Sequence, residues 1–432
     1  MDCERVKLSS QILIRSPGVI SGLGSGVAPV PNVLQHADEN DAIASGRMTD
    51  PFPVPLLSTR CVSRALHAGA LFASALALAA VALLGGCAKP EAVRPQRQPA
   101  EVRAQILRNI PAPTVDRDGW ATDVNAGFVA LQIDTSVRNI CAALAVAAQE
   151  SSFDADPVVP GLGRIAREEI DRRAERHHIP QLLVKGALLL KSPDGRTYGD
   201  RLERVRTERE LSLIFEDLIG SVPLGKQLFA DANPVRTGGP MQVSIVFAEQ
   251  YAKEHRYPYP IGNSIRDEVF TRRGGLYFGI AHLLGYPVSY DQMLFRFADY
   301  NAGFYASRNA AFQKAVSLTS GIALALDGDL IRYDDSEIGA TERAARTLGR
   351  RIGLSDSDIR SALEQGESID FESTELYRRV FALADQAAHA PQPRALLPRI
   401  ALESPKITRK LTTEWFANRV EQRYRACLNK GP

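Results

Sequence analysis

The chain has 432 residues, of which 45% are hydrophobic and 24% charged, and its formal net charge is +2 at pH 7. This composition is typical of a globular protein that is long enough to bury a large core. Nucleic-acid binding usually requires a strongly basic surface, and the near balance of charges gives no indication of one. We therefore expect no nucleic acid among the partners.

The first part of the chain, residues 1–59, contains scattered glycine, proline and serine without a periodic apolar pattern. Such a pattern predicts disorder, because little apolar surface is available for burial. Met48 is an alternative start of translation. If that start is used, the residues before it carry no function.

Residues 60–86 have the organisation of a signal peptide. Arg60 and Arg64 form a basic entry, an uncharged run rich in alanine and leucine covers 68–84, and two glycines precede Cys87. This pattern resembles a bacterial lipoprotein signal. The alternative is a transmembrane helix, but the apolar run is shorter than the roughly 20 residues that span a bilayer. The resemblance implies cleavage before Cys87, lipidation of that residue and permanent anchoring in a membrane.

The residue after the cysteine bears on the destination of the protein. In the lipoproteins that the signal resembles, an aspartate at this position retains the protein at the inner membrane, and here Ala88 follows Cys87. The resemblance therefore implies the outer membrane, on its periplasmic face or at the cell surface. Residues 87–113 are rich in proline, arginine, glutamine and alanine, and they predict a tether between the membrane and the folded part.

Five cysteines are present in the chain. Cys3 and Cys61 precede the expected cleavage and Cys87 would be lipidated, which leaves Cys141 and Cys427 in an oxidising compartment. This pair predicts one disulfide, and two buried free thiols are the alternative. Neither cysteine has the spacing of a metal site, so we expect no metal and no cofactor.

Beyond the tether, apolar residues recur with a spacing near 3.6 residues, whereas strand-like alternation is rare. We therefore predict a mainly α-helical protein. The predicted helices cover 137–149, 162–177, 180–190, 207–219, 243–255, 264–284, 290–300, 306–318, 340–352, 355–365, 372–388 and 407–428.

Three short motifs occur in order along these helices. They are Ala-Ala-Gln-Glu-Ser-Ser-Phe at 147–153, Gly-Pro-Met-Gln-Val-Ser at 239–244 and Ala-Asp-Tyr-Asn-Ala-Gly at 298–303. Together they resemble the motifs of lysozyme-like lytic transglycosylases, which cleave peptidoglycan. The resemblance is partial, because Pro240 stands where that family usually has leucine.

The same resemblance implies a lysozyme-like helical domain of the SLT type over residues 114–330, followed by a C-terminal helical extension at 331–432. The first two motifs are much farther apart than in the family. We therefore expect residues 154–237 to form a large helical insertion, which could narrow or cap the groove.

The chemistry of glycan cleavage suits the first motif. A glycosidic oxygen is a poor leaving group, so the reaction needs a carboxylic acid that stays protonated near neutral pH. Burial at the end of an apolar helix would favour that form of Glu150. In lytic transglycosylases, one glutamate acts as the acid and then as the base that draws a proton from the 6-hydroxyl of the sugar, which closes a 1,6-anhydro ring.

The resemblance thus assigns both catalytic roles to Glu150 and substrate-binding roles to five other residues. Ser151 would bond near the acid, Met241 and Gln242 would line the sugar sites, and Tyr300 and Asn301 would orient Glu150 and the substrate. Each of the five also has a purely structural interpretation. Ser151 would cap a helix, Met241 would fill the core, and the third motif would be only a helix end.

Four longer runs, at 156–162, 169–176, 237–244 and 272–279, are similar to the YaiW-like lipoproteins of Gram-negative outer membranes. That family has been connected with the passage of peptides through the envelope. We therefore expect an outer-membrane lipoprotein that binds peptidoglycan and, if Glu150 is active, cleaves it. The alternatives are a non-catalytic lipoprotein that binds a peptide or a partner protein, and a purely structural tether to the cell wall.

Overall fold

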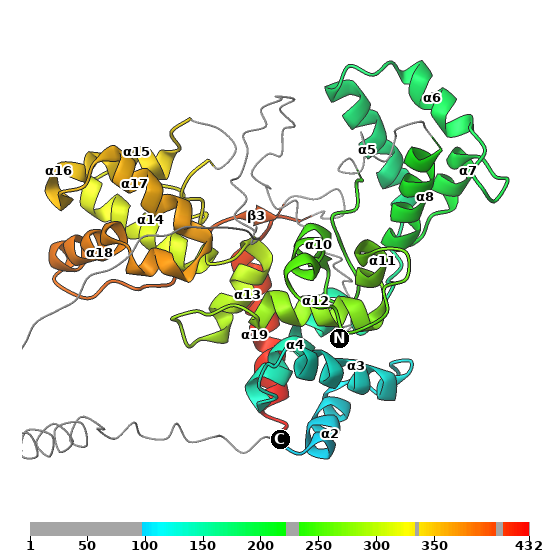
Figure 1. Ribbon diagram of the computed structural model, residues 1–432, viewed down its shortest axis with the longest axis horizontal. Helices are drawn as coiled ribbons and strands as arrows, with labels where there is room; N and C mark the ends of the chain where they lie inside the picture. Colours follow the sequence, from blue (N-terminus) through cyan, green and yellow to red (C-terminus); the bar gives the residue numbers. More distant parts are fainter. Residues whose placement is uncertain (1–96, 222–232, 333–336, 403–408, 432) are drawn as a thin grey trace, which may run out of the picture. The chain divides into compact units, whose positions relative to one another are not determined.

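The computed structural model describes residues 97–221, 233–332, 337–402 and 409–431 (Figure 1). The predicted disordered start at 1–59, the signal peptide at 60–86 and Cys87 lie outside these residues. Within the described ranges, no helix combines the length and the hydrophobicity that crossing a bilayer requires.

The described part is mainly α-helical, which confirms the prediction from periodicity, and its strands form two short antiparallel pairs. The first half contains α2 (Pro99–Asn109), α3 (Arg117–Ala130), α4 (Val137–Glu150), α5 (Leu162–Arg176), α6 (Gln181–Leu189), α7 (Tyr198–Arg204), α8 (Glu208–Gly220), β1 (Thr237–Gly238), β2 (Val243–Ser244) and α10 (Ile245–Glu254). The second half contains α11 (Ile265–Val269), α12 (Arg272–Leu284), α13 (Met293–Ala302), α14 (Ala306–Ser320), α15 (Ala340–Thr347), α16 (Gly349–Ile352), α17 (Asp356–Leu363), the 3-10 turns η2 (Glu364–Glu367) and η3 (Ile369–Ser373), α18 (Glu375–Ala388), β3 (Ala401–Leu402), β4 (Leu411–Thr412) and α19 (Thr413–Leu428).

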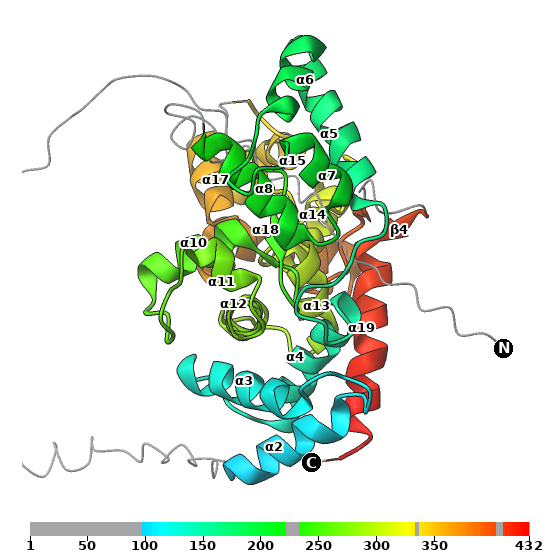
Figure 2. The ribbon, with the colours of Figure 1, turned by 90° about the vertical axis from the view of Figure 1, so that its right-hand side faces the viewer.

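A first hydrophobic core surrounds α4, most of whose residues are buried. The helix is rich in alanine, so neighbouring helices can approach its backbone closely. In sequence order, α19 is the last helix, yet it packs along both α4 and α13 (Figures 1 and 2). The last helix of the predicted C-terminal extension therefore shares a core with the helix that carries the first motif.

Part of the segment that we assigned to the tether also belongs to this core. Residues 99–109 form α2, which packs on α3, and Val102, Ile106 and Ile110 are almost completely buried. The apolar spacing of these three residues outweighs the proline- and arginine-rich composition around them, because together they bury one face of the helix. Residues 99–109 of the predicted tether are therefore helical and packed.

Two further cores lie outside the first. Residues 154–237, which we expect to be an insertion, are helical in their described part. Helices α5 to α8 share a second core with the hairpin of β1 and β2 and with α10 to α12. A third core joins α14 to α15, α16, α17 and α18. The helices of the C-terminal segment therefore divide between the third core and the first.

The predicted continuous helix over 264–284 is interrupted, which corrects that prediction. The chain breaks between α11 and α12, where the Thr271 hydroxyl accepts a hydrogen bond of 3.0 Å from the backbone N–H of Gly274. A threonine in this position caps a new helix, because it satisfies an N–H group that has no partner within the helix. The apolar periodicity continues across the break and conceals it.

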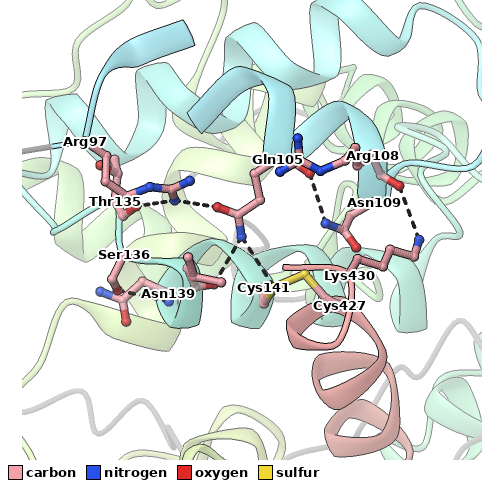
Figure 3. The surroundings of a disulfide bond; sticks show 11 residues. Arg97, Gln105, Arg108, Asn109, Thr135, Ser136, Asn139, Cys141, Cys427 and Lys430 are labelled. Atoms are coloured by element: carbon pink, nitrogen blue, oxygen red, sulfur yellow. Dashed lines mark hydrogen bonds between the residues drawn. A yellow bond between two sulfur atoms is a disulfide. The ribbon is translucent and has the colours of Figure 1, made fainter. Parts of the chain in front are cut away.

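A disulfide joins Cys141 of α4 to Cys427 of α19, with 5.6 Å between the Cα atoms and 286 residues between the cysteines in sequence (Figure 3). This confirms the predicted pairing. Gln105 of α2 lies beside the bond, and its Nε2 is 3.5 Å from the sulfur of Cys141. Near the end of the chain, Lys430 donates a hydrogen bond of 3.2 Å to the backbone oxygen of Arg108. The C-terminus is thus attached to both α4 and α2.

Candidate functional site

Glu150 is the last residue of α4, and only 5% of its surface is exposed. The next residue, Ser151, is also buried, and its hydroxyl donates a hydrogen bond of 3.0 Å to the backbone oxygen of Ala147. Ser151 therefore closes the last turn of the helix. Its structural interpretation is sufficient to explain this contact.

The chain turns sharply after α4. Ser152 and Phe153 have φ angles of 55° and 61°, a left-handed conformation that is unfavourable for residues other than glycine. Two consecutive residues of this kind persist only where the surrounding packing holds them. The Phe153 ring supplies that packing, because it is buried and meets the ring of Trp120 edge-on, with 5.4 Å between centroids. This turn sets the direction that the chain takes after α4.

The second motif forms the loop of the hairpin between β1 and β2. Gly239 has a φ of 71°, and a Cβ atom there would lie 2.0 Å from the backbone oxygen of Val269, so only glycine fits. Gln242 also has a positive φ, and its side-chain oxygen accepts a hydrogen bond of 3.1 Å from Thr237. Met241 is completely buried, as a core residue would be. The loop is therefore rigidly placed.

Tyr300, from the third motif, connects all three motifs. Its hydroxyl donates a hydrogen bond of 2.7 Å to the backbone oxygen of Met241. Burial raises the pKa of Tyr300 well above its usual value, and the charge of Glu150 raises it further. An electrostatic effect of this kind requires the two side chains to be near each other. The structure thus brings Glu150, Met241 and Tyr300 together from α4, the hairpin and α13.

The neighbouring residues of the third motif make contacts with other elements. The side-chain oxygen of Asn301 accepts a hydrogen bond of 2.8 Å from the hydroxyl of Thr413, at the start of α19. Asp299 is completely buried, and it accepts hydrogen bonds from Tyr290 and from the backbone N–H of Ser307. Burial raises the pKa of Asp299. These two side chains attach α13 to α19 and α14.

Two titratable residues near the site belong to none of the three motifs. Arg423 of α19 has a pKa that burial lowers and that the charge of Glu150 tends to raise, which places it within electrostatic range of Glu150. His282 of α12 is buried against the ring of Tyr300, with 4.9 Å between centroids. Burial lowers the pKa of His282 to about 4, so its ring is neutral at pH 7. Periodicity predicts both helices but cannot indicate what they face.

The site offers no evident metal centre. No group of three histidine, cysteine, aspartate or glutamate side chains within the described ranges could hold a metal ion. The chemistry available at the end of α4 is therefore that of a buried carboxyl group, a phenol, an arginine and a neutral imidazole. Such groups can transfer protons and form hydrogen bonds with a polar ligand.

The chain matches one family model and one protein of Escherichia coli. A model of the family described as "Protein of unknown function (DUF1615)" matches residues 113–430. "Uncharacterized protein YaiW" of Escherichia coli (strain K12) is 54% identical over 359 residues, which cover 83% of this chain and 98% of that protein. No solved structure matches the chain.

Proposed function

The chain belongs to the DUF1615 family, and we propose that it is an outer-membrane lipoprotein whose lysozyme-like domain binds and cleaves peptidoglycan glycan strands through Glu150. The observation that carries this proposal is the position of Tyr300. Its hydrogen bond to Met241 and its electrostatic interaction with Glu150 link three motifs that are far apart in sequence.

The environment of Glu150 supports a role as the acid. The residue is 5% exposed, and burial favours the neutral form of a carboxyl group. It also lies at the C-terminal end of α4, where the partial negative charge of the helix dipole disfavours an anion. Both effects disfavour the carboxylate of Glu150, whereas the positive charge of Arg423 favours it.

Arg423 supports the second half of the proposed reaction. After the proton has passed to the leaving oxygen, Glu150 is a carboxylate, and the positive charge of Arg423 stabilises it. That carboxylate then accepts the proton of the 6-hydroxyl while the oxygen bonds to the anomeric carbon. Glu150 ends the cycle protonated again. Tyr300 acts as a positioning residue, since its hydroxyl is bonded to Met241.

Digestion of murein sacculi tests the catalytic role. The purified protein should release fragments with 1,6-anhydro ends, which mass spectrometry detects, and Glu150→Gln should release none. Glu208→Gln is the matched control, because Glu208 is equally buried but belongs to the inserted segment. Equal release by the wild type and Glu150→Gln, or no release by either, would reject the proposed catalysis.

The second candidate is a non-catalytic envelope protein that binds a peptide or a partner protein. One observation favours it: α19 packs along α4 and α13 and is attached by a disulfide, and Glu150 is almost completely buried. A glycan strand would need access to a carboxyl group that the fold largely covers. This candidate predicts that Glu150→Gln has a normal cellular phenotype, whereas deletions within 154–237 abolish function.

The lipid anchor is proposed on the sequence alone. Metabolic labelling with a palmitate analogue should label the wild-type protein, and Cys87→Ser should abolish both the label and the recovery of the protein in outer-membrane fractions. A labelled Cys87→Ser protein would contradict the anchor without affecting the proposal for Glu150. Pull-down with sacculi tests peptidoglycan as the partner, independently of cleavage.

A further inference from the structure

Helix α6 exposes an unusual number of large apolar side chains. Leu182, Leu183 and Leu189 are 79%, 62% and 74% exposed, and Leu190 and Ile179 at the two ends of the helix are also exposed. Only one further leucine in the described ranges, Leu318, is exposed. We call Ile179, Leu182, Leu183, Leu189 and Leu190 the α6 stripe.

The spacing of these residues places them on one side of the helix. Positions separated by three, four or seven residues lie along a common face of an α-helix, and Leu182 and Leu189 within α6 follow this spacing. Leu183 adjoins Leu182, and Ile179 and Leu190 flank the helix at its two ends. The opposite face carries Val184 and Leu188, which are buried in the second core. Packing within the chain therefore explains the inner face of α6 and leaves the outer face uncovered.

Within residues 176–191, the charged side chains are all positive. The segment contains no aspartate or glutamate, whereas Arg176, Lys185 and Lys191 are exposed. Apolar side chains with a basic rim are typical of helices that lie on anionic membranes. A soluble surface without a partner rarely exposes such a patch.

The composition of the stripe favours a membrane over a protein partner. Protein interfaces are enriched in aromatic residues, methionine and arginine at their centres. The segment 176–191 contains no phenylalanine, tyrosine, tryptophan or methionine, and its apolar residues are aliphatic. The helix itself has nine residues, which is far too short to span a bilayer.

We propose that the α6 stripe inserts into the headgroup region of an anionic lipid bilayer. The leucines enter the boundary between headgroups and acyl chains, and Lys185 and Lys191 contact lipid phosphates. This contact is independent of the chemistry at Glu150. It gives the inserted segment a second attachment to the membrane besides any N-terminal anchor.

Fluorescence quenching tests the proposal in the full chain. The Leu182→Trp protein is reconstituted in vesicles of phosphatidylethanolamine and phosphatidylglycerol whose acyl chains are brominated. In vesicles without bromine, we expect the emission of the introduced tryptophan to shift to the blue. In brominated vesicles, we expect that emission to be quenched. The control is Val129→Trp, because Val129 is 65% exposed on α3 without a neighbouring apolar stripe, and its emission should persist.

Two further variants keep the test decisive. Leu189→Trp, about two helical turns away on the same face, should be quenched like Leu182→Trp. The double substitution Lys185→Glu and Lys191→Glu should restore the emission of Leu182→Trp in anionic vesicles. If brominated lipid leaves both probes unquenched, or quenches Val129→Trp equally, the membrane contact is refuted and the stripe is left for a protein partner.

Discussion

The hydroxyl of Tyr300 donates a hydrogen bond of 2.7 Å to the backbone oxygen of Met241, and this bond holds the end of α13 against the hairpin. Both groups are buried, so loss of the donor leaves the oxygen without compensation from water. The bond therefore links the second motif to the third. Its removal should affect the geometry around Glu150 more than the rest of the fold.

Tyr300→Phe should lower the free energy of unfolding by about 1.5 kcal/mol, because it leaves a buried oxygen unpaired. Urea denaturation measures this effect. Tyr305→Phe is a suitable control, since Tyr305 donates a similar bond of 2.9 Å to the backbone oxygen of Pro287. Release of anhydro fragments should fall in Tyr300→Phe and persist in Tyr305→Phe. Equal loss in both would assign only a structural role to Tyr300.

Gly279→Ala should destabilise the protein by about 1 to 3 kcal/mol, the usual range for overpacking a core. A Cβ atom at this position would lie 2.5 Å from the sulfur and 2.6 Å from the Cβ of Met241. In contrast, Gly186 of α6 has no atom within 4 Å of its added Cβ. Gly186→Ala should therefore stabilise the protein by up to about 1 kcal/mol through helix propensity. Thermal denaturation of the two variants should give shifts of opposite sign.

Loss of the disulfide should destabilise the chain strongly. The bond closes a loop of 286 residues. In the chain-entropy model, a cross-link over so long a loop destabilises the unfolded state by about 5 to 6 kcal/mol. The double variant Cys141→Ala and Cys427→Ala should therefore unfold at lower denaturant concentration. A reducing agent should shift the wild type toward this value and leave the variant unchanged. A wild type whose stability is independent of reductant would contradict the role of the bond.

His282 should make stability depend on pH. Burial lowers its pKa in the folded state to about 4, below the usual histidine value of 6.5. As the pH falls below 6.5, the unfolded chain binds the proton first, so the folded state loses stability until the pH reaches about 4. Between pH 7 and pH 5 the loss is about 2 kcal/mol. Over this interval, the free energy of unfolding of His282→Gln should fall correspondingly less. His177→Gln, at an exposed histidine, should lose as much stability as the wild type.

Local patterns predicted much of this fold. The periodic alanine and leucine residues of 137–149 identified α4 as a buried helix, and cysteine counting identified the pair Cys141 and Cys427. The break before Thr271 escaped prediction because apolar periodicity continues through it. Likewise, α2 was assigned to a tether because composition outweighed the three buried residues of its inner face.

Long-range placement could not be predicted in the same way. The pattern of 407–428 indicated a helix, but nothing local specifies that α19 packs on α4 or that Arg423 lies near Glu150. The leucines of α6 indicated a helix equally well whether their outer face is covered or exposed. Such relationships depend on contacts between distant segments, and a single sequence does not reveal them.

In the proposed reaction, Glu150 transfers the proton when a glycan strand is cut. The most direct measurement is a time course of 1,6-anhydro ends released from sacculi by equal amounts of folded wild type, Glu150→Gln and Glu208→Gln. We predict steady release by the wild type and Glu208→Gln and none by Glu150→Gln. Release by Glu150→Gln at the wild-type rate, or its absence from all three proteins, would contradict the account.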